Sequence, residues 1–306
     1  MCCVSRRTTL VAALLGLTFW APARSEGLPD GLSFLSAFEL PPDRVETSSG
    51  ADVTDTAWGF HSGAVIAPFG PLHQDGLRVK LHGGASAWSY DTKRVYCAMS
   101  AEEKKRATGA NFTKLCNDIA NRPLTAKERD DAAATIAPFG LTLEGDQIYQ
   151  QRAHKVMRYD IAVLPGYQAS WSALTLKAYL GPAMETRIIG PADPEKALDG
   201  AYWGAKTVLE GWLALGDAFW LSADASYFTG TQGYSLSLRP GYQPLDWLAL
   251  GPEAAVFGDA EDDSARAGGF LRIIIGKMEA TFSGGVSSNY DGGAGIYGSA
   301  GVYTKF

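Results

Sequence analysis

The chain has 306 residues, of which 46% are hydrophobic and 20% charged, so it has ample apolar surface for an ordered fold. Its 27 basic and 33 acidic side chains give a net charge of −6 without a basic block, which argues against a nucleic-acid partner. The 35 glycines disfavour a helical protein, and the absence of a Gly-X-Y period excludes collagen. These features leave a β-rich protein with many turns.

The first residues have the features of an export signal. Arg6 and Arg7 precede a short apolar run, and small residues at 21–23 offer a cleavage site. We expect residues 1–25 to be a signal peptide that is removed and residues 26–43 to be a periplasmic lead-in. No later stretch supplies the roughly 20 consecutive apolar residues that a membrane helix needs. A secreted soluble protein and a membrane β-barrel both fit these observations.

Period-two sorting of side chains distinguishes these two classes. From 174 to 188 the even positions are mostly apolar, whereas the odd positions carry three charges. A helix does not produce this pattern, because side chains two apart in a helix point to nearly opposite sides. The pattern recurs at 77–87, 157–169 and 265–275. Several runs reach the roughly 9–11 residues that a tilted strand needs to cross a bilayer, which favours a membrane barrel over a soluble β-sandwich.

The predicted fold class is all-β, a closed antiparallel transmembrane β-barrel of about 12 strands. We place these strands at 44–53, 57–68, 77–90, 154–170, 174–188, 201–215, 218–229, 233–244, 247–258, 264–276, 278–289 and 294–306. The longer connections, at 91–153, 189–200 and 259–263, fall on one side and short turns on the other. Barrels keep their short turns in the periplasm, so both chain ends of the 44–306 barrel are expected there, and only the turn at 70–76 is long for that side.

The insertion at 91–153 breaks the β pattern and is expected to be partly helical. Capping-box sequences begin at Ser100 and Thr125, so each starts a short helix. Cys97 and Cys116 are the only cysteines left after signal cleavage, and in an oxidising compartment we expect them to form a disulfide. Two cysteines with one nearby histidine do not predict a metal site. A loop of this length is usually functional or a plug, and it could cover the barrel mouth.

The polar face of the strands is expected to line the lumen. Fourteen charged side chains point inward by parity, namely Arg78, Lys80, Arg158, Asp160, Lys177, Glu185, Arg187, Glu210, Asp224, Arg239, Glu253, Arg266, Arg272 and Glu279. Opposite charges can fill a barrel with paired groups, or they can form a polar lining for a hydrophilic solute. Four inward aromatic residues are candidates for stacking on sugar rings, although packing is the alternative role, namely Trp88, Tyr179, Trp220 and Trp247.

Three short segments resemble the cellulose biosynthesis protein BcsS family. They are Ser49-Gly50-Ala51-Asp52, Val163-Leu164-Pro165-Gly166-Tyr167 and Gly251-Pro252-Glu253-Ala254-Ala255-Val256-Phe257-Gly258-Asp259. The resemblance covers most of 44–306 outside the insertion, which itself departs from the compact family pattern. It implies an outer-membrane barrel associated with bacterial cellulose production and export. It supplies no catalytic residues.

We therefore expect a barrel in the outer membrane of a Gram-negative bacterium that assists export or surface retention of a polysaccharide, above all cellulose. It would act without a cofactor or chemistry of its own. Its partners would be outer-membrane lipid, cellulose or another glucan, and the synthase or export machinery. A general small-solute porin is the first alternative. An outer-membrane lipid hydrolase is the second, although the chain has only four histidines and no G-x-S-x-G elbow.

Overall fold

The structure is a computed structural model that describes residues 43–110, 112–191, 193, 196–288 and 293–306. The expected signal peptide lies outside these residues, as does the lead-in apart from Asp43. The chain forms two compact units. The barrel unit holds the described residues up to Trp88, those of Val156–Ile189 and those from 196 onward, and the insertion unit holds those of Ser89–Lys155 and Gly190–Asp193.

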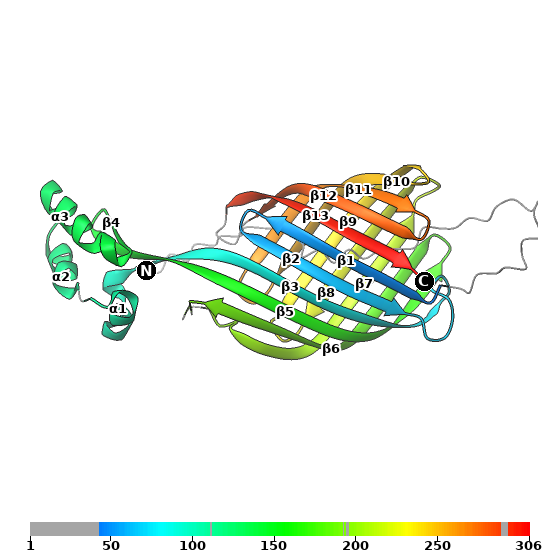
Figure 1. Ribbon diagram of the computed structural model, residues 1–306, viewed down its shortest axis with the longest axis horizontal. Helices are drawn as coiled ribbons and strands as arrows, with labels where there is room; N and C mark the ends of the chain where they lie inside the picture. The colour runs from blue at the N-terminus through cyan, green and yellow to red at the C-terminus, as the bar shows by residue number, and fades with distance from the viewer. Residues whose placement is uncertain (1–42, 111, 192, 194–195, 289–292) are drawn as a thin grey trace, which may run out of the picture. The chain divides into compact units, whose positions relative to one another are not determined.

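Twelve antiparallel strands of the described chain close into a barrel (Figure 1). They are β1 (Val45–Thr54), β2 (Ala57–Ile66), β3 (Gly76–Val95), β5 (Gln147–Trp171), β6 (Leu174–Gly190), β7 (Gly200–Ala214), β8 (Phe219–Phe228), β9 (Gly233–Leu245), β10 (Leu248–Gly258), β11 (Asp263–Ile275), β12 (Met278–Ser288) and β13 (Ala294–Lys305). Each pairs with its neighbours along the chain, and β1 pairs with β13 while β3 pairs with β5. The prediction of a closed twelve-stranded antiparallel barrel is confirmed.

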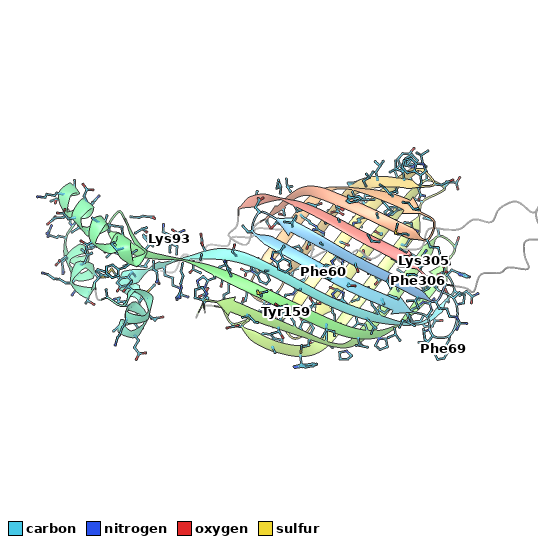
Figure 2. The ribbon with its side chains drawn as sticks, viewed as in Figure 1. Phe60, Phe69, Lys93, Tyr159, Lys305 and Phe306 are labelled. Atoms are coloured by element: carbon cyan, nitrogen blue, oxygen red, sulfur yellow. A yellow bond between two sulfur atoms is a disulfide. The ribbon has the colours of Figure 1, made fainter. Side chains whose placement is uncertain are left out.

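Period-two sorting sets which side of each strand faces the lumen. On β6, Lys177, Glu185 and Arg187 are buried, whereas Leu180 and Ile188 are more than half exposed. The alternation of a strand therefore puts charge inside and apolar surface outside. Exposed apolar and aromatic side chains cover the outer wall, including Phe60 and Tyr159 (Figure 2), together with Trp58, Val163, Trp171, Leu180, Trp203, Phe219, Leu238, Phe282 and Val286. Among the described residues, no helix has both the length and the apolar character to cross a membrane.

The connections differ between the two ends of the barrel. The terminal end, where the backbone N–H of Arg44 donates to the carbonyl of Phe306 at 2.7 Å, carries the turns at 67–75, 172–173, 215–218, 246–247 and 276–277. The opposite, loop end carries the two-residue turn Asp55-Thr56, the insertion, and the connections at 191–199, 229–232, 259–262 and 289–293. From β3 onward each loop-end connection is at least as long as the terminal-end turns beside it, and the expected alternation fails only where 215–218 and 229–232 have four residues each.

The insertion unit contains three helices among its described residues, α1 (Ala101–Thr108), α2 (Thr113–Asn121) and α3 (Ala126–Ile136), and the short strand β4 (Leu141–Glu144), which pairs with the start of β5. Helices α1 and α3 begin at the two capping boxes that the sequence indicates. Helix α2 was not expected, because its first residue follows Phe112, which offers no capping side chain. A core around Tyr96, Ile136 and Ile148 holds the unit together. A disulfide joins Cys97 and Cys116, whose Cα atoms are 5.5 Å apart.

Two strands are longer than the sequence indicates. We expected β3 to end at residue 90 and β5 to begin at 154, but they continue to Val95 and start at Gln147. The added segments belong to the insertion unit and are mostly polar on both faces. Without an apolar face, a strand shows no alternation that sequence reasoning can detect.

Candidate functional site

Four buried charges on four strands form a chain through the lumen. Lys177 Nζ on β6 lies 2.7 Å from Glu46 Oε1 on β1 and 4.0 Å from Glu210 Oε2 on β7. Lys80 Nζ on β3 lies 2.5 Å from Glu210 Oε1, and the Tyr303 hydroxyl on β13 donates to Glu46 Oε2 at 2.7 Å. Because β1 and β6 are not neighbours in the barrel, this lumen ion-pair chain crosses the interior from wall to wall.

Another buried carboxylate, Glu253 on β10, accepts hydrogen bonds from three strands. Arg239 Nε donates to it at 2.8 Å, the Tyr297 hydroxyl at 2.7 Å and the Ser283 hydroxyl at 3.1 Å. Removing a charge from water is unfavourable unless the charge is paired and hydrogen-bonded, and this carboxylate meets both conditions. The arrangement ties β9, β10, β12 and β13 together inside the barrel.

Aromatic side chains fill the space beside these charges. Trp220 stacks on Trp212 with ring centroids 4.3 Å apart and contacts Phe270 at 5.6 Å. The guanidinium of Arg272 lies over the Trp220 ring, 4.5 Å from its centroid. Such contacts between a cation and an aromatic face are stabilising when both are shielded from water. With 4% of its surface exposed, Trp220 therefore packs within the lumen rather than presenting a face to a solute.

Two histidines border a small cavity in the barrel wall. His82 Nε2 is 3.0 Å from Asp160 Oδ2, and Arg158 Nη2 donates to Asp160 Oδ1 at 3.2 Å. The cavity, of about 40 Å³, is also lined by His61 and Lys206. Asp160 is therefore the carboxylate partner of His82.

The turn at 67–75 is held against the inner wall of the terminal end. The Arg78 guanidinium donates to the backbone carbonyls of Leu72, at 3.1 Å, and of Gln74. The Gln168 amide on β5 donates to the same Leu72 carbonyl at 3.0 Å, and the Leu72 side chain is buried. Because Arg78 and Gln168 both lie on the inner face, the turn folds over the lumen. This explains why the turn is longer than the others at this end.

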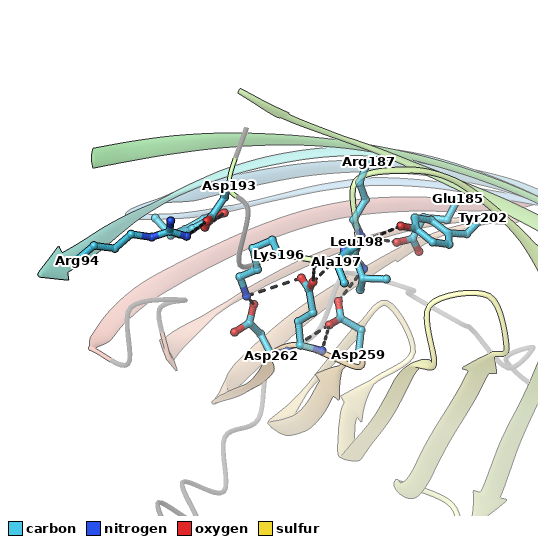
Figure 3. A network of polar contacts seen from close by, with 12 residues as sticks. Arg94, Glu185, Arg187, Asp193, Lys196, Ala197, Leu198, Tyr202, Asp259 and Asp262 are labelled. Atoms are coloured by element: carbon cyan, nitrogen blue, oxygen red, sulfur yellow. Dashed lines mark hydrogen bonds and ion pairs between the residues drawn. The ribbon is translucent and has the colours of Figure 1, made fainter. Parts of the chain in front are cut away.

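Charged contacts also join loops across the loop end (Figure 3). On β6, Arg187 Nε lies 2.6 Å from Glu185, and Arg187 Nη2 lies 2.6 Å from Asp259 of the β10–β11 loop. Lys196 of the β6–β7 loop lies 2.5 Å from Asp262. Since β6 and β10 are not neighbours, these contacts link separate parts of the rim. Within the insertion unit, Arg94 pairs with Asp193 at 2.7 Å.

The family of cellulose biosynthesis protein BcsS matches residues 141–306, which include every barrel strand from β5 to β13. The chain belongs to this family. The resemblance inferred from the short glycine-rich segments is confirmed over residues 141–306, whereas the segment Ser49–Asp52 lies outside the match. The chain is a cellulose-biosynthesis-associated barrel. No curated protein matches the chain.

Several solved outer-membrane barrels are similar to this BcsS-family chain in fold. The KdgM porin in complex with disordered oligogalacturonate is 9% identical with a TM-score of 0.41, covering 85% of this chain and 99% of its own. The NalP translocator domain of Neisseria meningitidis is 10% identical with a TM-score of 0.40, covering 90% and 92%. The AIDA-I transport unit of Escherichia coli is 9% identical with a TM-score of 0.41, covering 88% and 92%. At these values the likeness says nothing about what this chain binds.

Most residues that the sequence assigns to the lumen are enclosed in this BcsS-family barrel. Twelve of the fourteen charged side chains are at most 7% exposed, namely Arg78, Lys80, Lys177, Glu185, Arg187, Glu210, Asp224, Arg239, Glu253, Arg266, Arg272 and Glu279. Arg158 and Asp160 are slightly more exposed, at 18% and 12% of their side chains. The candidate sugar-stacking residue Tyr179 is buried beside Leu164 and Val208. Trp88 is half-buried and lines a cavity.

Trp247 lies in the turn between β9 and β10, one residue before the strand begins, and is 53% exposed. It is therefore not enclosed as Tyr179 and Trp220 are. Sequence reasoning also omitted Glu46 and Asp52 from the lumen, because β1 is polar on both faces and its inward side could not be chosen. Their shared even parity is the signal that would have placed them together.

Proposed function

We propose that this BcsS-family barrel lies in the outer membrane of a Gram-negative bacterium and assists export or surface retention of a polysaccharide, with cellulose as the polymer. Family membership supports the link to cellulose. The apolar outer wall and the charged interior support a membrane-spanning barrel. The placement of Arg44 and Phe306 beside the short turns supports a periplasmic terminal end. In this proposal residues 1–25 are removed on export.

The observation that carries this proposal is the ion-pair chain across the lumen. Lys177 and Glu46 join two parts of the wall that are four strands apart, so their side chains span part of the lumen at this level. A general porin keeps an aqueous channel, which a lumen crossed by paired side chains does not provide. The geometry therefore favours a barrel that guides or holds a polymer over a permanently open pore for small solutes.

A deletion strain tests the proposal. Cell-bound and released cellulose are measured separately, together with synthase activity in isolated membranes. We expect cell-bound cellulose to fall while synthase activity stays unchanged, and a plasmid copy of the gene to restore retention. An unchanged amount and distribution of cellulose in the deletion strain would contradict the proposal.

The hydrolase alternative is tested in the same strain. Complementation with a His61→Ala and His82→Ala double variant is expected to restore cell-bound cellulose, because neither imidazole has a catalytic role in the proposed function. Loss of a lipid-hydrolysing activity in this variant would instead support the enzyme. A matched control is His73→Ala, which changes a histidine in the turn at 67–75.

A further inference from the structure

A cavity lies inside the loop end of the barrel, between strands that are far apart in the sequence. Its lining includes Trp88 of β3, Asp52 of β1, Arg266 of β11 and Ser287 of β12. Its volume is about 50 Å³. On that measure it has room for roughly four water-sized groups, which matches the hydroxyl-bearing edge of one sugar ring better than a whole ring. We call it the Trp88 cavity.

Two polar side chains of the cavity lining are buried, and each has at least one polar atom without a hydrogen-bond partner in the described part of the chain. Arg266 is 3% exposed, and its Nε and Nη2 atoms have no hydrogen-bond partner there. Ser287 is 4% exposed, and the same holds for its hydroxyl. Buried polar groups in folded proteins almost always find partners. Arg266 and Ser287 both belong to the lining of this cavity, and a ligand that carries hydroxyl groups fits their unpaired polar atoms.

The charge around the cavity points to a neutral ligand. The Arg266 guanidinium is 3.7 Å from the Asp52 carboxylate, and it lies over the Tyr297 ring at 4.5 Å from the centroid. Asp52 offsets the positive charge of Arg266, so the cavity does not select an anion as an unpaired guanidinium would. The other polar residues of its lining carry hydroxyls without charge, namely Thr54, Thr56, Ser86, Ser264 and Ser288.

Trp88 supplies the apolar wall that a sugar requires. Arg187 lies over its ring at 5.8 Å from the centroid, which helps to fix the indole at the cavity edge. The C–H face of a pyranose is apolar, while its rim carries hydroxyls, so a flat aromatic wall beside polar groups suits it. An alkyl chain would use the wall but leave the buried donors unpaired, which disfavours a lipid.

We propose that the Trp88 cavity is a binding subsite for one glucose unit of a β-glucan chain. The sugar ring contacts the indole of Trp88, and its hydroxyls bond to Arg266 and Ser287. The inference rests on the proposed function for its choice of polymer, and it adds a defined contact point at the loop end of the barrel, away from Arg44 and Phe306. A glucan held there is retained at the cell surface.

Isothermal titration of the full-length barrel in detergent micelles with cellohexaose tests the subsite. We expect Trp88→Ala to weaken binding about tenfold, the upper range for one aromatic contact, and Ser287→Ala about fivefold, as for one lost hydrogen bond. Trp88→Phe keeps a flat apolar wall and should retain most of the affinity. Trp203→Ala is the matched control, because Trp203 is 73% exposed on the outer wall. Maltohexaose, with α-linkages, should bind more weakly than cellohexaose.

The outcomes separate the subsite from the proposed function. Wild-type affinity in both Trp88→Ala and Ser287→Ala would overturn the subsite, and so would the absence of cellohexaose binding to the wild-type barrel or equal binding of maltohexaose. The deletion strain decides the polysaccharide role independently of these results. If Trp88→Ala does not fold, as judged by circular dichroism, Ser287→Ala and Trp88→Phe carry the test, with a fivefold loss expected only in the former.

Discussion

The ammonium group of Lys177 on β6 lies 2.7 Å from the carboxylate of Glu46 on β1, on another part of the barrel wall. Both side chains are almost fully buried, at 5% and 8% exposed. Few contacts inside a barrel constrain it as strongly, because strand pairing fixes neighbours whereas this pair fixes the width of the lumen. It therefore bears on stability and on passage through the barrel.

For stability, we expect Glu46→Gln to lower the free energy of unfolding by about 3 kcal/mol, because it leaves a buried ammonium without its main partner. The double variant Glu46→Gln, Lys177→Met should lose less than the sum of the single changes. Urea unfolding in lipid vesicles measures this. The matched control is Lys93→Met, which breaks the exposed Lys93–Glu144 pair and should cost less than about 1 kcal/mol. Strict additivity in the double variant would show that the buried pair is not coupled.

For passage, we expect the wild-type barrel in planar bilayers to carry little steady current, and Glu46→Ser with Lys177→Ser to carry more. The serine side chains no longer reach across the lumen, so water and ions can occupy the space. Single-channel recording measures the difference. Changing Lys93 and Glu144 in the insertion unit should leave the current unchanged. A large open current in the wild type would favour the porin alternative.

The sequence was sufficient to predict the fold, because alternate residues of a barrel strand face lipid and lumen and therefore differ in polarity. In β6 the alternation between Leu180 and Glu185 reflects lipid on one side and the lumen on the other. The sequence was not sufficient to predict the ion pairs in the lumen. An odd or even position in a strand shows whether a side chain faces the lumen, but not which distant strand it faces. Glu46 and Lys177 are 131 residues apart, and nothing local in either strand indicates the other.

The same limit applies to the interior aromatic residues. The alternation of the strands predicts that Trp220 and Trp88 both face the lumen. In the structure Trp220 is enclosed by Trp212 and Phe270, whereas Trp88 borders a cavity. The difference depends on three-dimensional packing between strands that the sequence does not align. Helix α1 was predictable because its capping signal is local, from Ser100 to Glu103.

An interior glycine, compared with a glycine on the outer face, tests how tightly the lumen is packed. A Cβ on Gly241 of β9 would overlap the Trp220 ring, whereas a Cβ on Gly298 of β13 would meet nothing within 4 Å. We expect Gly241→Ala to destabilise the barrel by about 1–3 kcal/mol through overpacking, and Gly298→Ala to have no destabilising effect. Urea unfolding gives the energies, and near-ultraviolet circular dichroism reports the displaced indole. Equal stability of the two variants would show that the interior adapts to added volume.

The insertion unit should unfold separately from the barrel when its disulfide is removed. Cys97→Ser with Cys116→Ser opens a loop of about 20 residues, which costs about 3 kcal/mol on the chain-entropy estimate. The small core around Tyr96 and Ile136 has little else to hold it, whereas the barrel is closed by strand pairing throughout. We therefore expect trypsin to cleave the double variant within 91–153 faster than the wild type, while the barrel keeps its heat-sensitive migration on gels. Ser100→Ala, which removes only the α1 cap and costs about 1 kcal/mol, should have a smaller effect on cleavage. Loss of barrel migration together with cleavage would show that the two units fold as one.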